Sequence, residues 1–492
     1  MATQVHVRQD VWALETAHDT WDPISLAYAR AVGEMQRRPS TDPTSWSYQA
    51  AIHGTYARVP RGADWNVCQH ASWFFPPWHR MYLYWFERIV RSIVVEQGGP
   101  ADWALPYWNY SKGFPDNTLP PAFRERALPD GSPNPLFVQA RNQRPRPGIN
   151  GGAQLPPRAT SYAYAFQFED YIGDQTQGFG GGRSPAVQFD HATGALENQP
   201  HNIIHDLVGG ATSGQCGGGL MSDPLCAARD PIFWLHHSNI DRLWSLWIAQ
   251  GGRRANPTDR SWLDQPFTFH DERGREVQMH VSDVLTVEQL GYRYDDQPPT
   301  VARRIRRPVA AARMGGEESV ADLVAASQGG VELSGQPATV DIPLDAPGRE
   351  AVSGITESVE PANVYLNVEG VEADENPGVV YEIYVDLPEG EEAPVDDDAH
   401  FVGHVTFFSA KHARGPGDHD VAGGLRHTFD ITALVQELQA RGLWRDDRVR
   451  VTFVPLGLLP PPGQEAVPEA AMEPEERAVP TARIGRVSLV RG

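Results

Sequence analysis

Six histidines are the residues most able to do chemistry in this sequence, and they fall into two triplets. The triplets are His53, His70 and His79, followed by His201, His205 and His237. Neutral imidazole is the usual protein ligand for copper and other borderline metals. His201 and His205 are four residues apart, so a helix places both on one face, where they can hold one ion together. Two such triplets predict a pair of three-histidine sites with open positions, which suits a metal pair that binds oxygen between its members.

The elements that must position these histidines are predicted to be helices. Helical periodicity runs from about His79 to Val95 and from about Pro231 to Ala249. Four histidine-bearing helices that face inward form a bundle with a metal site in its core. Residues 111–195 are rich in proline and glycine and predict a long irregular connection between the two helix pairs.

The motifs around the histidines resemble those of the type-3 dicopper proteins, which are the tyrosinases, polyphenol oxidases and molluscan haemocyanins. The likeness covers roughly residues 1–300 and rests on the nine-residue step from His70 to His79, the HxxxH pair, and DPIFWLHHSNIDRLW from Asp230 to Trp244. It implies two copper ions, with the first triplet at the site called CuA and the second at CuB. His236 competes with His237 for the third CuB place, which the family pattern gives to His237.

Four further residues close to the ligands bear on the reaction that the resemblance implies. Glu197 matches the family's water-holding glutamate, and Asn202 matches the position that pairs with it to deprotonate phenols. A carboxylate-held water is useful as a base because a phenol is mostly protonated at neutral pH. The alternative is a helix-capping Glu197 and a surface amide at Asn202. Phe233 and Asp206 are expected in the substrate pocket. Plain core is the alternative for Phe233, and Asp206 leaves the preferred substrate charge open.

Asp241 and the three cysteines complete the set of candidate residues. Asp241 lies one helical turn beyond His237 and is expected either to orient a ligand histidine or to pair with an arginine such as Arg242 or Arg88. Cys68 precedes His70 by two residues and resembles the family's thioether-linked cysteine; a small buried thiol is the alternative. The remaining two, Cys216 and Cys226, flank a glycine-rich loop and can pair, although free thiols are expected in a reducing cytosol.

Composition limits the partners and predicts where the protein works. The chain has 492 residues, 40% of them hydrophobic, and a formal net charge of −21. This charge, with no basic patch to offset it, argues against nucleic acid or an anionic membrane as a partner. No signal-like segment is visible near the N-terminus, and no apolar run approaches the ~20 residues that span a bilayer. We therefore expect a cytoplasmic protein; a homo-oligomer and a copper-delivery partner stay open.

The last third of the chain changes character after the Tyr292-x-Tyr294 motif, which resembles the end of the catalytic domain in plant-type polyphenol oxidases. Residues 301–339 are expected to form a linker with an arginine-rich start, and residues 340–492 an all-β, sandwich-like domain. The predicted strands are Asn363–Val368, Val379–Leu387, Phe401–Phe408, Leu425–Ile431, Val449–Val454 and Ile484–Val490. The expected fold is thus a mainly α catalytic domain over residues 1–300 followed by this sandwich.

The function that the resemblance implies is copper-dependent hydroxylation of monophenols to o-diphenols and oxidation of o-diphenols to o-quinones by dioxygen. A zinc protease of the HExxH type is excluded because Asn202 stands where its glutamate is needed. An o-aminophenol oxidase, a catechol oxidase without monophenolase activity, and a haemocyanin-like oxygen carrier are the alternatives. Residues 340–492 are expected to shield the copper entrance, so cleavage near Arg307 should activate the enzyme. Which residue fills the pocket cannot be read from the sequence.

Overall fold

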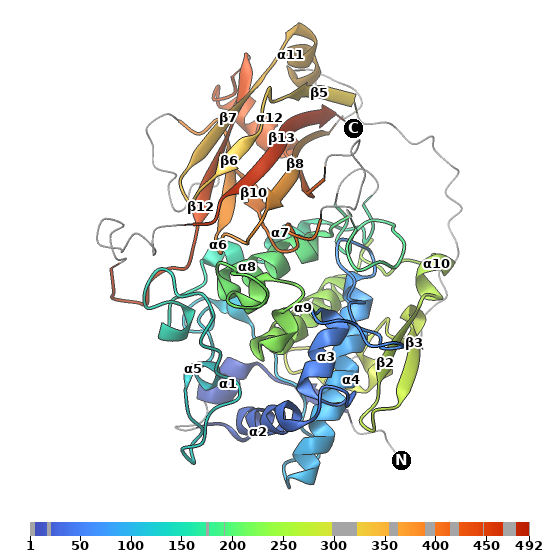
Figure 1. Ribbon diagram of the computed structural model, residues 1–492. Coiled ribbons are helices and arrows are strands. Elements are labelled where there is room, and N and C mark those ends of the chain that lie inside the picture. Colours follow the sequence, from blue (N-terminus) through green and yellow to red (C-terminus); the bar gives the residue numbers. More distant parts are fainter. Residues whose placement is uncertain are drawn as a thin grey trace.

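The structure is a computed structural model that describes residues 5–16, 21–173, 177–190, 192–297, 322–353, 363–388, 399–413, 423–445, 447–465 and 479–491. It consists of a helical region up to Tyr294 and a β region from Asp322 onward, which lies above the helices in Figure 1. The basic segment around Arg303–Arg307 and the cleavage predicted there lie outside the described residues.

The helical region is built on a few long helices joined by short ones. Its helices are α1 (Val11–Thr16), α2 (Pro23–Arg37), α3 (Trp46–His53), α4 (Phe75–Glu96), α5 (Pro121–Arg124), α6 (Pro157–Thr160), α7 (Ala163–Gln167), α8 (Ile203–Gly209), α9 (Ile232–Ala249) and α10 (Arg260–Leu263). Single turns and short strands are η1 (Tyr110–Lys112), η2 (Ile149–Gly151), η3 (Glu197–Asn202), η4 (Leu220–Ser222), η5 (Ala227–Arg229), η6 (Val281–Asp283), η7 (Val287–Leu290), β1 (His6–Arg8), β2 (Pro266–His270), β3 (Glu276–His280) and β4 (Tyr292–Tyr294).

Local sequence explains where the long helices begin. Asp22 caps α2 by accepting hydrogen bonds from the backbone N–H groups of Ile24 and Ser25, and Pro23 occupies the first turn. Helix α4 also begins with prolines in its first turn, and α3 is capped by Ser45. Helices α4 and α9 pack against each other in a core rich in tryptophan. The connection between α4 and η3 holds only short elements, as its proline and glycine content predicts.

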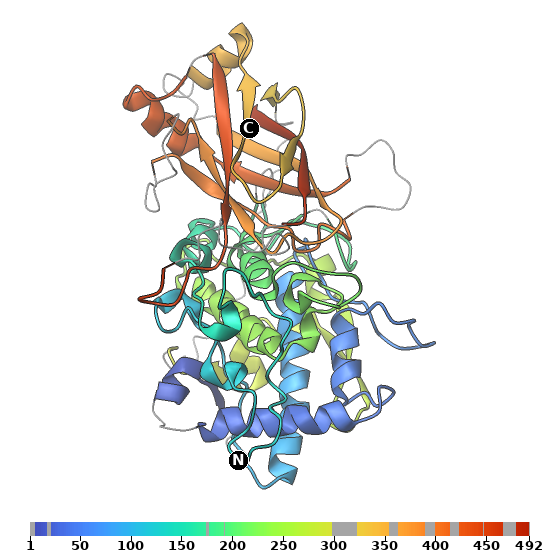
Figure 2. The same cartoon turned by 60° about the vertical axis from the view of Figure 1, so that its left-hand side comes forward.

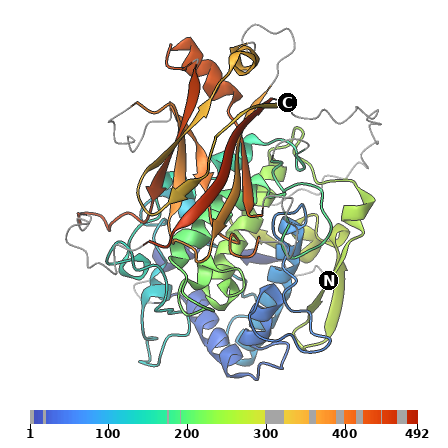
Figure 3. The ribbon, with the colours of Figure 1, turned by 45° about the horizontal axis from the view of Figure 1, so that its top comes forward.

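The β region is a two-sheet structure with a hydrophobic core of its own. Its strands are β5 (Asp322–Ala326), β6 (Val331–Leu333), β7 (Ala338–Pro343), β8 (Val364–Ala373), β9 (Val380–Val385), β10 (Phe401–Val405), β11 (Leu425–Asp430), β12 (Arg448–Leu456) and β13 (Ala482–Arg491). One antiparallel sheet has the order β10-β9-β12-β7 and the other β11-β8-β13-β5, with β6 also paired to β13. Figure 2 and Figure 3 show both sheets above the helical region.

Two expectations about the β region are corrected. Strands β5, β6 and β7 begin inside residues 301–339, so the sheets start well before residue 340 and the linker is shorter than expected. The region is also not all-β, because it contains α11 (Ala346–Ser353) and α12 (Thr432–Ala440). The sequence of α12, TALVQELQA, combines good helix formers with Val435 and Leu438, which it buries in the core of the β region. Each of the six strands predicted from residue 363 onward overlaps a strand of the structure.

The two regions are in direct contact. Val380, Phe408 and Leu458 of the β region belong to the hydrophobic core of the helical region. Among the described residues, no helix has the length and apolar character needed to cross a membrane.

Candidate metal centre

The six histidines come from five helical elements and one extended segment. His53 ends α3, His79 lies in the first turns of α4, His201 is in η3, His205 is in α8 and His237 is in α9. His70 is not helical: its backbone forms a bridge with Phe189, a residue of the long connection. The turn η3 is interrupted at Gln199, whose backbone is extended with φ −142° and ψ 124°. Because η3 runs directly into α8, the histidines other than His70 lie on four helical segments, the number that the sequence predicts.

The side chains of the two triplets converge on one space. Potential ligand atoms of His53, His79 and His237 lie within 4.8 Å of one another, as do those of the group His201, His205, His236 and His237. His70 joins the first triplet, with its ring centroid 5.1 Å from that of His53. Between the triplets, the rings of His79 and His237 stack with centroids 4.4 Å apart. The structure thus brings all six predicted ligands together.

Hydrogen bonds turn several rings so that one nitrogen is left for a metal. The Nδ1 atoms of three histidines lie next to backbone carbonyls: Pro224 O for His53 (2.8 Å), Phe75 O for His79 (2.9 Å) and Met221 O for His205 (2.6 Å). The Nε2 atoms of His53, His70, His79 and His201 are buried and have no partner among the described residues. Buried polar atoms are normally satisfied, so this convergence of unsatisfied imidazole nitrogens fits copper.

Burial also sets the protonation state of the site. It lowers the pKa of His53 to about 3, and burial together with neighbouring imidazoles lowers the pKa of His70 and His205 well below the ordinary value. Burial disfavours the charged imidazolium, so the rings stay neutral at physiological pH. Neutral imidazole is the form that binds a metal.

His236 and His237 both lie in the CuB cluster, and their hydrogen bonds differ. His236 Nδ1 lies 3.3 Å from the hydroxyl of Tyr110, whereas its Nε2 has no partner. His237 Nε2 lies 3.3 Å from His205 Nε2, and only His237 belongs to the clusters of both triplets. His237 therefore occupies the central position between the two sites.

Cys68 lies against His70, as the CxH spacing suggests. Its sulfur is buried, 3.3 Å from Nδ1 of His70, and the cysteine is free. Burial raises the pKa of the Cys68 thiol, so it is protonated at neutral pH. The two side chains are adjacent, and the thioether itself stays a prediction.

Glu197 and Asn202 lie on either side of His201. Both carboxylate oxygens of Glu197 accept from the backbone N–H of Ala71, at 2.8 and 2.9 Å, and burial raises the pKa of Glu197 to about 8. The side-chain oxygen of Asn202 lies 2.8 Å from Nδ1 of His201 and fixes that ring. Glu197 is thus not a helix cap, and Asn202 is buried rather than a surface amide. Both line one small cavity together with His70.

Phe233 lies among the ligand rings and Asp206 against the β region, and neither lines the small cavity beside His70. Phe233 packs between the rings of His53 and His237, with centroid distances of 4.9 and 4.1 Å, and is fully buried. Asp206 accepts from the backbone N–H of Phe407 at 2.7 Å and from the side chain of Asn376 at 2.6 Å. Asp206 therefore binds the β region, and its burial raises its pKa to about 7.

Asp241 does not orient a ligand histidine. One carboxylate oxygen accepts from Arg80 at 2.5 Å, and the other accepts from Tyr292 at 2.6 Å and from Tyr294 at 2.5 Å. Arg8 also donates to it, so the arginines are not the Arg242 or Arg88 expected from the sequence. A contact with a ligand histidine was expected from the spacing of Asp241 and His237 on α9. The Asp241 side chain instead faces the tyrosine motif of β4. That motif is thereby tied into the helical core.

Phe408 is a site residue that sequence reasoning missed. Its ring stacks on His205 with centroids 4.1 Å apart and lies edge-on to His70 and His201, at 5.6 and 5.5 Å. The cavity lined by Phe408, Glu197 and Asn202 leaves about 10 Å3 for the centre of a water molecule, which is room for about one water. The only sequence signal was the aromatic pair at residues 407–408, at the end of a predicted strand.

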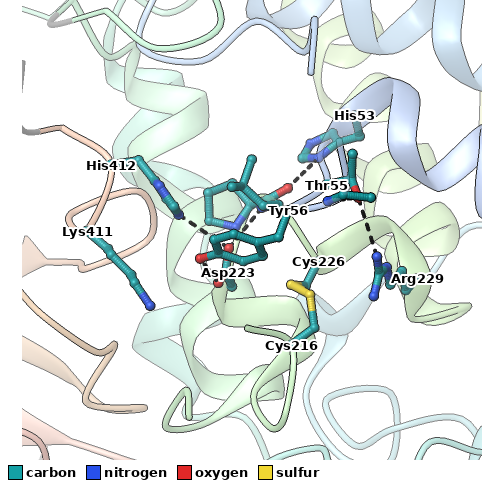
Figure 4. Close-up of a disulfide and its surroundings, with 12 residues drawn as sticks. His53, Thr55, Tyr56, Cys216, Asp223, Cys226, Arg229, Lys411 and His412 are labelled. Carbon is teal, nitrogen blue, oxygen red and sulfur yellow. Dashed lines mark hydrogen bonds and ion pairs between the residues drawn. A yellow bond between two sulfur atoms is a disulfide. The ribbon is translucent and has the colours of Figure 1, made fainter. Parts of the chain in front are cut away.

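The remaining two cysteines form a disulfide, contrary to the expectation of free thiols. Cys216 and Cys226 are bonded, with Cα atoms 5.7 Å apart. Figure 4 shows this disulfide with its surroundings, which include Asp223 and His53. The expectation had rested on a reducing compartment rather than on the geometry of the loop.

Known protein families match most of the chain. Residues 43–250 match the common central domain of tyrosinase, and residues 256–308 match the polyphenol oxidase middle domain. Residues 320–467 match a domain of unknown function, and this range includes β5 to β12 of the β region.

Individual relatives extend this likeness to nearly the whole chain. A tyrosinase from Hahella sp. (strain CCB-MM4) is 33% identical over 479 residues, which cover 91% of this chain and 95% of that protein. A chloroplastic polyphenol oxidase from Malus domestica is 29% identical over 462 residues, which cover 87% of this chain and 72% of that protein. The solved structure of latent apple tyrosinase has the same fold, with a TM-score of 0.59, 22% identity, and coverage of 99% of this chain and 97% of that one.

The expectation of a cytoplasmic location is corrected by these comparisons. The relatives from Prunus armeniaca, Malus domestica and Vicia faba are chloroplastic polyphenol oxidases. The first residues of the sequence therefore give no ground for a cytoplasmic assignment, and the Cys216–Cys226 disulfide removes the argument from free thiols.

The histidine clusters and the match to the Hahella protein lead to the same assignment. The chain belongs to the tyrosinase and polyphenol oxidase family, whose members are oxidoreductases with a pair of copper ions as cofactor.

Proposed function

We propose that this chain hydroxylates monophenols to o-diphenols and oxidises o-diphenols to o-quinones with dioxygen. The first triplet would hold one copper ion and His201, His205 and His237 the other. When bound, the copper pair supplies the redox chemistry and activates dioxygen. The observation that carries the proposal is the small cavity that joins His70, Glu197 and Asn202 at the edge of the histidine cluster.

Glu197 and Asn202 would prepare the phenol by moving a proton. The cavity has room for about one water between polar side chains that can hold it. Glu197, whose pKa is raised to about 8, is in its ionised form a stronger base than an ordinary carboxylate and would take the phenol proton through that water. Asn202 holds the ring of His201 and adds a polar group to the same cavity. These residues favour monophenolase activity over catechol oxidation alone.

Phe408 would keep the enzyme latent until it moves. Its ring covers His205 and touches one histidine of each triplet, so a phenol ring has no room beside the ligands. This geometry supports the prediction that the β region shields the copper entrance. The segment around Phe408 is fixed by the hydrogen bonds of Asp206 to Phe407 and Asn376, so opening requires that these contacts break.

A haemocyanin-like oxygen carrier is the non-enzyme alternative, and it uses the same six ligands. An o-aminophenol oxidase differs only in substrate. The polar pair at the cavity favours an enzyme, because a carrier has no phenol to deprotonate.

The test is oxygen uptake by the copper-loaded chain and its Phe408→Ala variant with tyrosine, catechol and 2-aminophenol. We expect uptake with tyrosine and catechol, faster in the variant. Uptake with catechol but none with tyrosine in the variant would limit the enzyme to catechol oxidation. Uptake with 2-aminophenol alone would make it an aminophenol oxidase. No uptake with any of the three by the copper-loaded variant would favour the carrier.

A further inference from the structure

One loop, Cys216–Cys226, contributes to both triplets. Two backbone carbonyls of this loop each accept a hydrogen bond from one histidine of a triplet. Met221 O accepts from Nδ1 of His205 at 2.6 Å, and Pro224 O accepts from Nδ1 of His53 at 2.8 Å. The disulfide joins the two ends of this loop. More than half of the helical region lies between His53 and Pro224 in the sequence, so only the folding of the chain brings these two residues into contact.

The loop is pressed against the ends of both helices that carry these histidines. A Cβ atom at Gly54, directly after His53, would lie 2.5 Å from Pro224 O and 2.7 Å from Leu225 Cα. A Cβ atom at Gly209, the last residue of α8, would overlap the backbone nitrogen of Ser222. Only glycine leaves room for so close an approach of two backbones. Each of the two helix ends is therefore closely fitted to the loop at its own glycine.

Further bonds fix the loop between the cysteines. Asp223 accepts from the hydroxyl of Tyr56 at 2.8 Å, and its backbone carbonyl accepts from the N–H of Cys226 at 2.8 Å. The hydroxyl of Ser222 donates to the backbone carbonyl of His205 at 3.2 Å. Figure 4 shows Asp223 and Tyr56 beside the disulfide, with His53 on the opposite side of the loop.

We propose that the disulfide-closed loop Cys216–Cys226 is a shared positioning device that holds one imidazole of each copper site with Nε2 toward the metal. A carbonyl that accepts from Nδ1–H fixes both the tautomer and the orientation of a metal-bound imidazole. The disulfide restricts the loop, so that both carbonyls stay in place. Cys216, Cys226, Met221 and Pro224 are positioning residues, since they would act through His53 and His205. The inference rests on the proposed copper centre.

The test measures copper loss rather than activity. The full chain and its Cys216→Ser/Cys226→Ser variant are loaded with copper and dialysed against a chelator, and the copper left per chain is followed over time. Loss of such outer hydrogen bonds typically weakens metal binding by about 10–100-fold. We expect the variant to lose both copper ions faster by a factor in this range. Val32→Ala in α2, a buried helix that carries no site histidine, provides a control for lowered stability.

Two single substitutions keep the inference falsifiable if the cysteine variant folds poorly. Gly54→Ala should speed loss of one copper ion and Gly209→Ala loss of the other, so each chain should show one fast and one unchanged phase. Unchanged copper loss in the cysteine variant, or loss no faster than in a Val32→Ala chain of equal melting temperature, would overturn the proposal. Two equally accelerated phases in both glycine variants would also contradict it. A wild-type chain that binds no copper would refute the copper centre itself instead.

Discussion

Buried histidines occur in both regions of the molecule, but among the described residues only those of the helical region form groups that could hold a metal ion. In the β region, burial lowers the pKa of His404 to about 3 and that of His427 to about 4, and their Nε2 atoms have no hydrogen-bond partner among the described residues. In these respects they match His53. They differ in surroundings, because neither belongs to a group of potential ligands within 4.8 Å of one another. Burial and a lowered histidine pKa therefore do not by themselves indicate a metal site, whereas the convergence of several potential ligand atoms does.

The histidines of the β region serve a different purpose. Nδ1 of His404 lies 3.0 Å from the side-chain oxygen of Gln199, and Nδ1 of His427 lies 3.0 Å from that of Asn198. Asn198 and Gln199 separate Glu197 from His201. The helical region thus builds the site, while the β region contacts the segment that carries the proposed base.

The largest gain in activity is expected from removing the aromatic ring that the β region places on the site. Phe408→Ala should raise catechol oxidation several-fold without changing the copper content, because it clears the space over His205. The measurement is initial oxygen uptake per bound copper. Phe114→Ala, at a side chain that is 60% exposed, is the matched control. Equal rates in the Phe408 variant and the control would show that Phe408 does not close the site.

A second prediction concerns the helical region's own polar residues. Asn202→Gly in the Phe408→Ala chain should lower monophenol turnover by about 10²-fold, the lower end of what a positioned acid or base contributes, and catechol turnover far less. Tyrosine and catechol turnover are compared in one preparation of known copper content, because Asn202 also bonds the ring of His201. If the turnover of tyrosine and that of catechol fall equally, Asn202 acts only by holding the ring of His201.

A smaller effect is expected at the contact between the regions. Asp206→Asn replaces a carboxylate oxygen that accepts from a backbone N–H of the β region. Hydrogen bonds to charged groups contribute about 1.5–3 kcal/mol, so loosening this one should raise catechol oxidation, though less than Phe408→Ala does. The measurement is the same oxygen uptake assay. Unchanged latency in a fully copper-loaded variant would mean that Asp206 does not hold the segment shut.

The smallest effect is a change in how stability depends on pH. The pKa of Glu197 rises from 4.5 to about 8 on folding, so the folded state binds its proton more tightly than the unfolded state does. The stabilisation is complete below the unfolded pKa and is lost as pH rises through about 8. In the copper-free full chain, Glu197→Gln should therefore lose less stability than the wild type between about pH 5 and pH 9, measured by urea unfolding. Parallel pH curves for the two chains would refute the raised pKa.

The sequence predicted the residues whose spacing is local or whose motif is dense. The convergence of the six histidines and the positions of Glu197 and Asn202 beside them were expected from the resemblance to dicopper proteins. The later strands were expected from their alternating pattern. Phe408 was not found, since its place over His205 depends on how two regions pack together. The partners of Asp241 were missed because Arg80, Tyr292 and Tyr294 are distant from it in the sequence. The pairing of Cys216 with Cys226 was missed because a reducing compartment was assumed.

We propose that six imidazoles of the helical region hold two copper ions. Copper per purified chain tests it most directly, in the wild type and in the His237→Ala, His236→Ala and His427→Ala variants. We predict two copper ions in the wild type, in His236→Ala and in His427→Ala, and roughly one in His237→Ala, because a site that loses one of three imidazoles holds its ion weakly. Two ions in His237→Ala together with one in His236→Ala would assign the ligand to His236. Loss of copper in His427→Ala, or a wild type without copper, would contradict the account.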